Sequence, residues 1–389
     1  MTVEPGCTVN GCIHAFAYAT SYTQYAAKKY AAPGFNVLNG FTQYTITYVS
    51  DGKEITGSIF FPDSTPPAEG FSVVVANQFT SGVGASCAPS AGKLAAGVAG
   101  VAALSGYVTL VPDATSYGTA PYGAYLWGKV AGRAALDGAR AAFHTSQGIG
   151  QPIARKAVIA GLSQGAYSTM AAATEYPSYA NELEIRGFAA AEPPSNFRSG
   201  ANAALTSTTL NVVYDAMRMW SWQGDLMLTG GQLFQPPYDT QIPQWLQNDC
   251  VYNGADGLQG TLSDNFYEPY PDGGMPTTPI PASSIFSSTF VGYAMNDSWP
   301  SDWAAAYASA QAIPTGLALP VLIFEGSADT TVLPKDADAY VAQLKAAGVN
   351  VDYRQIPNGT HGTTALSSFT VVQVADDQAL AWFASTLAN

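Results

Sequence analysis

The chain has 389 residues, a formal net charge of −13 at pH 7 and a sequence pI near 4.4. This length suits one large domain with an insertion or two domains, and the acidic balance argues against nucleic acid or an anionic membrane as a partner. No apolar run approaches the ~18 residues of a membrane-spanning helix, so we expect no integral membrane segment.

The first part of the chain predicts an arm followed by a hairpin. Residues 1–40 carry aromatic side chains with little periodicity and are interpreted as an N-terminal arm. Two strand patterns, 44–49 and 54–61, flank Asp51-Gly52, a dipeptide that favours a two-residue hairpin turn. These residues therefore predict a pair of antiparallel strands.

From residue 71 to residue 191, strand patterns and helix patterns alternate. This alternation predicts an α/β fold with a mostly parallel central sheet and helices on both of its faces. The predicted strands are 71–76, 107–111, 156–160 and 186–191, and the predicted helices are 91–104, 122–144 and 166–174.

The alternation stops at Glu192-Pro-Pro and resumes at Leu319. We interpret the residues between these points as a mainly helical cap over the carboxyl edge of the sheet. The predicted organisation is an arm of residues 1–40, a core of residues 41–192 and 316–389, and a cap of residues 193–315.

The cap is rich in tryptophan. It combines helix patterns with Pro/Gly-rich loops, and five of the seven tryptophans lie in it. Either these side chains fill the core of a small cap, or they line a pocket for an apolar substrate. The helix patterns are 210–222 and 299–312, the loops are 234–242 and 268–281, and the tryptophans are Trp220, Trp222, Trp245, Trp299 and Trp303.

A Gly-Leu-Ser-Gln-Gly motif at residues 161–165 joins a strand pattern to a helix pattern. A serine on such a sharp turn exposes its hydroxyl, and the glycines let the strand and the helix approach closely. The five letters alone are a weak signal, with an ordinary Gly/Ser turn as the alternative, so the prediction depends on the strand–turn–helix context. Ser163 is the candidate nucleophile.

A serine nucleophile needs a base, and the chain has only three histidines. In the chain order typical of this turn the base follows the nucleophile, which leaves His361 in a polar loop after the strand pattern 349–356. His144 ends a helix pattern and is predicted to cap its carboxyl end. His14 has no evident role.

The acid that orients the histidine is predicted to be Asp329. It follows the apolar strand pattern 319–324, and open α/β sheets place their chemistry beyond the carboxyl ends of such strands. Glu325 is the rival, although it lies at the strand end itself. Asp336 and Asp338 are predicted to lie in the first turn of the next helix.

An oxyanion hole is predicted from two backbone donors. One is the N–H of Gln164, the residue after the nucleophile, and the other comes from the loop after strand 71–76. Each such donor typically lowers the barrier by roughly 3–4 kcal/mol. Thr80 and Ser81 are the candidates in that loop, and the sequence does not choose between them.

The four cysteines are Cys7, Cys12, Cys87 and Cys250. Four cysteines allow three pairings. Cys7 and Cys12 frame a short turn that could close locally, which leaves a long-range pair between Cys87 and Cys250. Four free thiols in a cytosolic protein are the alternative.

The chain resembles the α/β-hydrolase superfamily and, within it, secretory lipases of the fungal lipase A type. Motifs similar to those of that family follow one another in order over most of residues 43–389, and their order is more specific than any one of them. The similar segments are 87–90 (Cys-Ala-Pro-Ser), 105–113 (Ser-Gly-Tyr to Asp), 136–140 (Leu-Asp-Gly-Ala-Arg), the motif at 161–165, 179–187, and 329–334, with His361 at the position of the family's histidine.

This resemblance implies ester hydrolysis through Ser163, Asp329 and His361 under a helical cap, and a Cys87–Cys250 disulfide. Two segments depart from the family. Residues 77–86 lack the acidic residue that the family carries in its oxyanion loop, and residues 114–117 lack its Glu-Gly. The oxyanion hole is therefore expected to be built differently, and the preference for an acyl chain does not transfer through the divergent cap.

The sequence therefore predicts a secreted serine esterase or lipase that cleaves apolar or aromatic esters, extending to phthalate- or polyester-type substrates. The alternatives are a serine peptidase of the same fold and a non-catalytic binding protein on a hydrolase scaffold. No metal or cofactor is predicted, because no His/Cys cluster has metal-ligand spacing and no Gly-rich phosphate loop is present.

Secretion, into the extracellular space or the periplasm, is expected from the composition. Only 11% of the residues are charged, and small polar residues are expected to cover the surface. The first residues show no basic-then-apolar signal pattern, so we expect the sequence to begin at a mature or engineered terminus. The sequence does not predict an oligomeric state.

Overall fold

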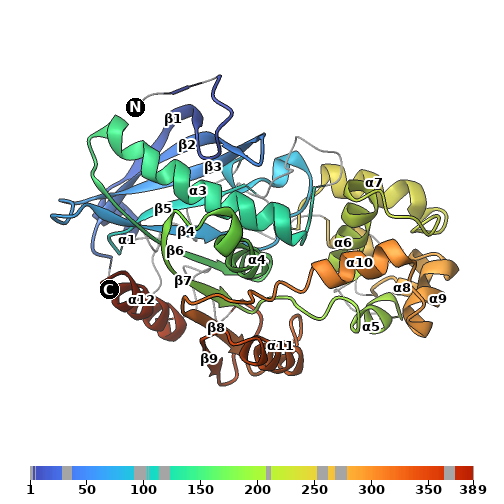
Figure 1. The fold of residues 1–389 in the computed structure, drawn as a ribbon. Helices are drawn as coiled ribbons and strands as arrows, with labels where there is room; N and C mark the ends of the chain where they lie inside the picture. The colour runs from blue at the N-terminus through green and yellow to red at the C-terminus, as the bar shows by residue number, and fades with distance from the viewer. Residues whose placement is uncertain are drawn as a thin grey trace.

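The chain folds around one nine-stranded sheet with the strand order β1-β2-β3-β5-β4-β6-β7-β8-β9 (Figure 1). The structure is a computed structural model that describes residues 3–4, 6–28, 37–91, 103, 105–113, 123–206, 212–251, 262–267, 278–362 and 373–388. The strands are β1 (Ile13–Tyr22), β2 (Gly40–Ser50), β3 (Lys53–Asp63), β4 (Phe71–Asn77), β5 (Val108–Pro112), β6 (Ile153–Leu162), β7 (Glu184–Ala191), β8 (Val321–Gly326) and β9 (Val351–Ile356).

The sheet is antiparallel at one end and parallel through the rest. Strands β1, β2, β3 and β5 pair antiparallel in succession, whereas β5, β4, β6, β7, β8 and β9 pair parallel. Strands β2 and β3 form the predicted hairpin, in which Asp51 and Gly52 both have positive φ, as the twist of a two-residue turn requires. The prediction of a mostly parallel α/β sheet is confirmed.

Strand β1 lies within the segment interpreted as an arm. It forms the edge of the sheet against β2, and its register shifts twice, between Ile13 and Ala15 and between Tyr18 and Thr20. Each shift breaks the two-residue alternation by which a strand is recognised in a sequence. The sequence pattern therefore did not predict this strand.

Both faces of the parallel part of the sheet are buried. Along β6, Ala157 and Ile159 join a hydrophobic cluster with α3 and α4, whereas Val158 and Ala160 join a second cluster with α12 on the other face. Burial on both faces explains why the parallel strands read as continuous apolar runs. The helices of the core are α1 (Gln24–Lys28), α3 (Gly128–Ile149), α4 (Gln164–Tyr179), α11 (Pro334–Ala346) and α12 (Gln373–Ala388), and two 3-10 turns follow β4, η1 (Ala85–Cys87) and η2 (Pro89–Ala91).

Helix α3 differs from its prediction at both ends. It begins at Gly128 and continues to Ile149, where Gly150 adopts a left-handed conformation as its C-cap. His144 therefore lies inside the helix and caps nothing, and its Nδ1 is 3.0 Å from the carbonyl oxygen of Gly11. The predicted helix 91–104 lies almost entirely outside the described residues.

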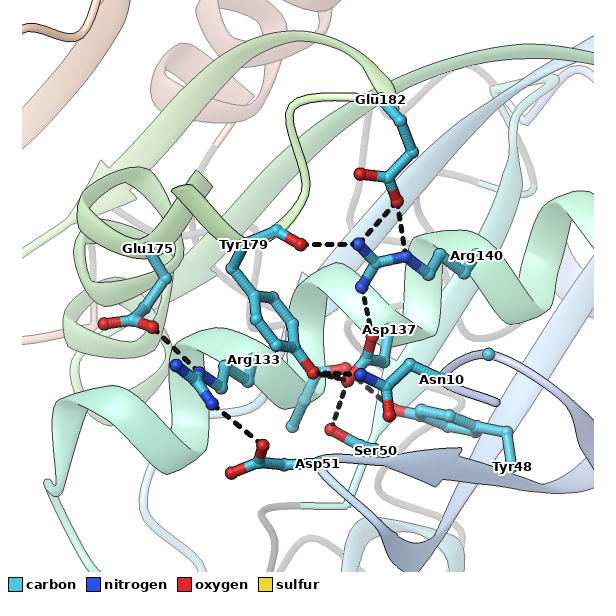
Figure 2. A network of polar contacts seen from close by, with 12 residues as sticks. Asn10, Tyr48, Ser50, Asp51, Arg133, Asp137, Arg140, Glu175, Tyr179 and Glu182 are labelled. Carbon is cyan, nitrogen blue, oxygen red and sulfur yellow. Dashed lines mark hydrogen bonds and ion pairs between the residues drawn. The ribbon is translucent and has the colours of Figure 1, made fainter. Parts of the chain in front are cut away.

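A polar network joins helix α3 to the end of α4 and to the β2–β3 hairpin (Figure 2). Its centre is Asp137, a fully buried carboxylate that accepts hydrogen bonds from Ser50 and Tyr179 and forms an ion pair with Arg140. The guanidinium groups of Arg133 and Arg140 lie 4.3 and 5.0 Å from the centre of the Tyr179 ring. The predicted motif at 136–140 therefore has a structural role in this fold.

The segment between β7 and β8 is mainly helical and lies at one end of the sheet (Figure 1). The loop predicted at 234–242 is partly wrong, because helix α7 begins at Tyr238 after two prolines and contains Pro243. Pro236 and Pro237 precede the helix, where a missing N–H costs little. Pro243 is its sixth residue, so the helix lacks the hydrogen bond that an N–H there would make to the carbonyl oxygen of Asp239. The elements of this segment are α5 (Ala201–Thr206), α6 (Val212–Asp225), α7 (Tyr238–Asn248), η3 (Asp264–Phe266), α8 (Ala282–Ile285), α9 (Ser288–Asn296) and α10 (Ser301–Ser309).

Aromatic side chains hold these helices to one another and to the core. Trp222 and Trp303 are fully buried, and Trp222 packs edge-to-face against Trp127, which precedes α3, and against Tyr307 of α10. The Nε1 of Trp222 also donates to the carbonyl oxygen of Tyr125. This packing favours a core role for these tryptophans, while Trp245 stays partly exposed.

Two disulfides are formed, Cys7–Cys12 and Cys87–Cys250. The first closes the local turn, and the second ties the 3-10 turn η1 after β4 to the segment after α7, as the family resemblance implied. The alternative of four free thiols is therefore wrong. In the part of the chain that the structure describes, no helix has the length and apolar character to cross a bilayer.

Candidate active site

The Gly-x-Ser-x-Gly segment forms a strained turn between β6 and α4. Ser163 has φ 52° and ψ −117°, a conformation that a residue with a side chain rarely adopts, and its N–H donates to the carbonyl oxygen of Ala191 in β7. A Cβ on Gly161 would collide with the backbone of Gly165, and one on Gly165 would collide with the carbonyl oxygen of Asn77. The two glycines thus permit the approach that presents the serine hydroxyl at the end of the sheet.

Three predicted side chains meet at this end of the sheet. The Nε2 of His361 lies 3.0 Å from the Oγ of Ser163, although the two residues are 198 positions apart. The Nδ1 of the same imidazole lies 2.8 Å from the Oδ2 of Asp329. Because Nδ1–H donates to a carboxylate, Nε2 is the nitrogen that can accept the hydroxyl proton of the serine.

Asp329 is held rigidly by backbone groups in the loop after β8. It is 3% exposed, and its Oδ1 accepts hydrogen bonds from the N–H groups of Thr331 and Val332, at 2.7 and 3.0 Å. Its second oxygen is thereby aimed at His361. The carboxylate position matches the expectation that chemistry lies just beyond the end of a buried strand.

Glu325, the rival acid, occupies a different environment. Its side chain is fully buried at the end of β8, and neither carboxyl oxygen makes a well-formed hydrogen bond. Burial, together with the nearby charges of Asp329 and Glu192, raises the pKa of Glu325 to about 9. Glu325 is therefore neutral at pH 7 and does not supply the negative charge that orients the imidazole.

The environment of His361 raises its pKa. Burial by itself lowers the pKa, but the hydrogen bond to Asp329 and the charges of Glu192 and Asp329 outweigh it. The imidazole side chain remains 23% exposed, so it is open to solvent on one side. The site therefore favours the imidazolium that forms when the histidine takes a proton.

Glu192, which the sequence analysis did not single out as a site residue, is a second carboxylate at the imidazole. It follows β7, its side chain is fully buried, and its Oε2 lies 3.2 Å from the Nδ1 of His361. The same oxygen accepts the N–H of Gly362 at 2.7 Å. The strand-end rule that identified Asp329 applies equally to Glu192, so the sequence did carry a signal for it.

The hydroxyl groups of the two oxyanion-loop candidates form hydrogen bonds with groups other than the serine. The Oγ1 of Thr80 is 2.8 Å from the hydroxyl of Tyr125, and the Oγ of Ser81 donates to the carbonyl oxygen of Cys87. Gln164 begins α4, where N–H groups have no intrahelical acceptor. The assignment of backbone donors from Gln164 and from Thr80 or Ser81 stays a prediction.

One group in the site has the spacing of a metal centre. The ligand atoms of Glu192, Asp329 and His361 all lie within 4.8 Å of one another. However, both carboxylates face Nδ1, the nitrogen that carries the proton when Nε2 accepts from Ser163. A hydrogen-bonded proton accounts for this spacing without an ion.

Comparisons with known proteins agree with this architecture. A family model described as secretory lipase matches residues 98–211, and one described as prolyl oligopeptidase family matches residues 285–389. No curated protein sequence matches the chain.

Solved structures are similar over nearly the whole chain. The rice cell wall degrading esterase LipA from Xanthomonas oryzae is 18% identical with a TM-score of 0.73, covering 98% of this chain and 97% of its own. An inferred hydrolase from Legionella pneumophila is 16% identical with a TM-score of 0.77, covering 96% and 98%. Candida antarctica lipase A in its closed state is 16% identical with a TM-score of 0.65, covering 92% and 79%.

The chain therefore has the α/β-hydrolase fold, as predicted, and its resemblance to secretory lipases is confirmed. These matches support a hydrolase of the lipase or esterase type. At this level of identity the solved structures establish the fold, and the chemistry has to be argued from the residues of this chain.

Proposed function

We propose that the protein is a serine carboxylic-ester hydrolase in which Ser163 is the nucleophile, His361 the general base and Asp329 the orienting acid. The observation that carries the proposal is the continuous hydrogen-bond chain from the Ser163 hydroxyl through both nitrogens of His361 to Asp329. A hydroxyl that can lose its proton to an adjacent imidazole as it attacks is the requirement for acyl transfer.

The proposed reaction has two halves. In the first, Ser163 attacks the ester carbonyl while His361 takes its proton, and His361 then protonates the departing alcohol to leave an acyl-enzyme. In the second, His361 deprotonates a water molecule that attacks the acyl group and frees Ser163. Backbone donors at Gln164 and in the loop of Thr80 and Ser81 would stabilise the negative oxygen in both halves.

Apolar or aromatic esters are the proposed substrates, extending to phthalate- or polyester-type molecules. The mainly helical segment 193–315, proposed as the cap, is dense in aromatic side chains and is tied to the loop after β4 by the Cys87–Cys250 disulfide. Small or polymeric esters would enter between this cap and the carboxyl ends of β6 to β8. No cofactor is proposed.

An extracellular or periplasmic location is proposed on two grounds. Disulfides persist in oxidising compartments and are rare in the cytosol, and this chain forms two of them. The secretory-lipase match over residues 98–211 points in the same direction.

The decisive experiment is hydrolysis of a p-nitrophenyl ester series of increasing acyl length by the wild type and by Ser163→Ala. We expect the variant to lose at least about 10⁴-fold in kcat for every ester, because the nucleophile is absent. Ser168→Ala on the same helix is the matched control, because its hydroxyl donates to the carbonyl oxygen of Gln164 within the helix. Equal turnover by wild type and Ser163→Ala would refute the proposal, and the binding-protein alternative would gain if neither turned over any ester.

The pH dependence of kcat/KM provides an independent check. Protonated His361 cannot act as a base, so the rate must fall as the pH drops through its pKa. Since this pKa is raised, we expect the midpoint of the acid limb to lie above 6.5. A profile that stays flat from pH 5 to pH 8 would contradict the role of His361.

A serine peptidase is the second candidate function. The prolyl oligopeptidase-family match over residues 285–389 favours it, because this segment contains both Asp329 and His361. Aminoacyl and prolyl p-nitroanilides, assayed beside the ester series, separate the two. Turnover of the amides with kcat/KM above that of the esters would replace the esterase proposal.

A further inference from the structure

Glu192 occupies a position that is costly to maintain. Its φ is 55°, a left-handed conformation that is unfavourable for a residue with a Cβ, and Pro193 follows it directly. Strain of this kind typically costs roughly 1–3 kcal/mol and persists where the surrounding structure enforces it. Here the N–H of Glu192 donates to the carbonyl oxygen of Phe324, which fixes the residue against β8.

The strained backbone presents the side chain to the imidazole from the strand next to the nucleophile. Strand β7 lies between β6, which leads to Ser163, and β8, which leads to Asp329. Glu192 and Asp329 therefore approach the same nitrogen of His361, at 3.2 and 2.8 Å. Asp329 also accepts two backbone N–H groups and Glu192 accepts one, so both carboxylates are held in place.

We propose that Glu192 is a positioning residue that shares the Nδ1 proton of His361 with Asp329 and supports the same imidazole tautomer when Asp329 is removed. This inference rests on the proposed function of Ser163 and His361. One N–H can be shared between two acceptors, as it is at helix termini, and two carboxylates stabilise an imidazolium more than one does.

The charges around the imidazole are consistent with this role. Within the described residues, Asp329 and Glu192 act on His361, and Glu192, Asp329 and Asp338 of α11 act on the neutral acid Glu325. Apart from His361 itself, every one of these groups is acidic. The two carboxylates at Nδ1 therefore favour the imidazolium over the neutral imidazole.

A purely structural role is the competing explanation. The bond from the N–H of Gly362 to Glu192 ties the loop that carries His361 to the end of β7. Glu192→Gln keeps this tie, because an amide oxygen accepts the same N–H, but it removes the negative charge at Nδ1. The variant therefore separates positioning through charge from fastening of the loop.

The test measures ester hydrolysis by Glu192→Gln, Asp329→Asn and the double variant. We expect Glu192→Gln to lose about 10-fold in kcat with little change in KM, and the midpoint of its acid limb to move to lower pH. Loss of the orienting carboxylate alone is expected to cost up to ~10⁴-fold where no second acid exists. Here we expect Asp329→Asn to lose only about 10²–10³-fold, and the double variant to fall to the level of His361→Ala.

Two further variants sharpen the result. Glu192→Asp retains the charge and is expected to keep the wild-type acid limb, even if kcat falls because the shorter side chain sits farther from Nδ1. Glu182→Gln is the matched control, since this glutamate is 56% exposed and pairs with Arg140 away from the site. An unchanged acid limb in Glu192→Gln, with Asp329→Asn already as inactive as His361→Ala, would overturn the inference.

A measurement that needs no catalysis distinguishes failure of this inference from failure of the proposed function. In a Ser163→Ala background with ¹⁵N-labelled histidine, the titration of His361 is followed by NMR in the presence and absence of Glu192→Gln. We expect the substitution to lower the pKa of His361 and to leave that of His14 unchanged. An active Ser163→Ala variant would refute the proposed function, whereas an unmoved His361 titration would refute the role of Glu192.

Discussion

Two regions of this protein bury carboxylates in opposite ways. Asp137 is fully buried between α3 and the β2–β3 hairpin, where Ser50, Tyr179 and Arg140 satisfy it (Figure 2). At the carboxyl ends of β7 and β8, by contrast, Glu192 and Glu325 are fully buried and Asp329 nearly so, and only Glu192 and Asp329 have His361 as a partner.

The difference separates a structural use of buried charge from a functional one. The Asp137 carboxylate accepts hydrogen bonds from Ser50 and Tyr179 and pairs with Arg140, so the network gives a stable and specific packing of α3. Around His361 negative charge is in excess, and both Ser163 and Glu192 have positive φ. An arrangement that favours an added proton and stores backbone strain is expected where a reaction takes place.

The largest expected effect comes from removing the imidazole. His361→Ala should lower kcat by about 10⁴–10⁶-fold, because no other side chain among the described residues of the site is placed to take the serine proton. The melting temperature should fall as well, because Glu192 and Asp329 stay buried after losing the imidazole that pairs with them. The measurement is burst and steady-state ester hydrolysis, with a thermal melt of the same preparation.

His144→Ala is the control for that substitution. This histidine lies on α3 and contacts the carbonyl oxygen of Gly11, so its loss should leave kcat within about twofold. If both variants lost activity equally, the contrast between the site and the α3 region would not hold.

A smaller effect, on stability alone, is expected from Asp137→Asn. Burial raises the pKa of Asp137 despite its hydrogen bonds, so the ionised carboxylate is not stabilised relative to its state in water. The substitution is destabilising because the asparagine amide places an N–H donor among other donors and leaves at least one of them unpaired. We expect the free energy of unfolding to fall by about 3 kcal/mol. Urea unfolding should show this loss, with kcat per folded molecule unchanged.

Asp51→Asn is the matched control in the same network. Asp51 is 48% exposed and pairs with Arg133, and exposed pairs contribute well under about 1 kcal/mol. Asparagine also tolerates the positive φ of this turn position. Equal destabilisation by the two substitutions would mean that burial does not determine how much each contact of this network contributes to the free energy of unfolding.

The sequence predicted most clearly those features whose signals are local. The turn at Ser163 has its own motif, and Asp329 and His361 each follow a strand pattern, so the topology of a parallel sheet brings them to one edge. Strand β1 was missed because two register shifts interrupt its alternation. Helix α7 was missed because its prolines resemble a loop until their place in the helix is known.

Other features depend on tertiary contacts that no local pattern encodes. Glu192 lies one residue beyond a predicted strand, yet only its left-handed backbone directs the side chain to His361. The hydroxyl group of Thr80 forms a hydrogen bond with Tyr125, which is distant in the sequence. That of Ser81 donates to the Cys87 carbonyl, which it reaches only because of the path that the loop takes. The sequence could place these residues near the site, but it could not predict the direction in which their side chains point.

The smallest expected effect concerns Glu325 and depends on pH. Its folded-state pKa of about 9 lies above the ordinary value of 4.5, so the folded protein holds a proton that the unfolded chain has released. Wild-type stability therefore decreases as the pH rises from about 4.5 towards 9, whereas Glu325→Gln cannot ionise in either state. We expect the variant to gain stability relative to wild type between pH 5 and pH 8, by at least about 1.4 kcal/mol, the equivalent of one pKa unit.

This gain distinguishes Glu325 from the two acids that contact His361. Glu325→Gln should retain nearly full ester hydrolysis at pH 7, because a neutral amide replaces an already neutral acid, whereas Glu192→Gln should not. Glu69→Gln serves as the control, since Glu69 is 75% exposed beside Lys156 and should show no comparable pH-dependent gain. Chemical denaturation at pH 5, 6.5 and 8 measures how the stability difference between variant and wild type changes with pH. A difference that stays constant would mean that Glu325 is ionised in the folded protein. The site would then contain three charged acids rather than two.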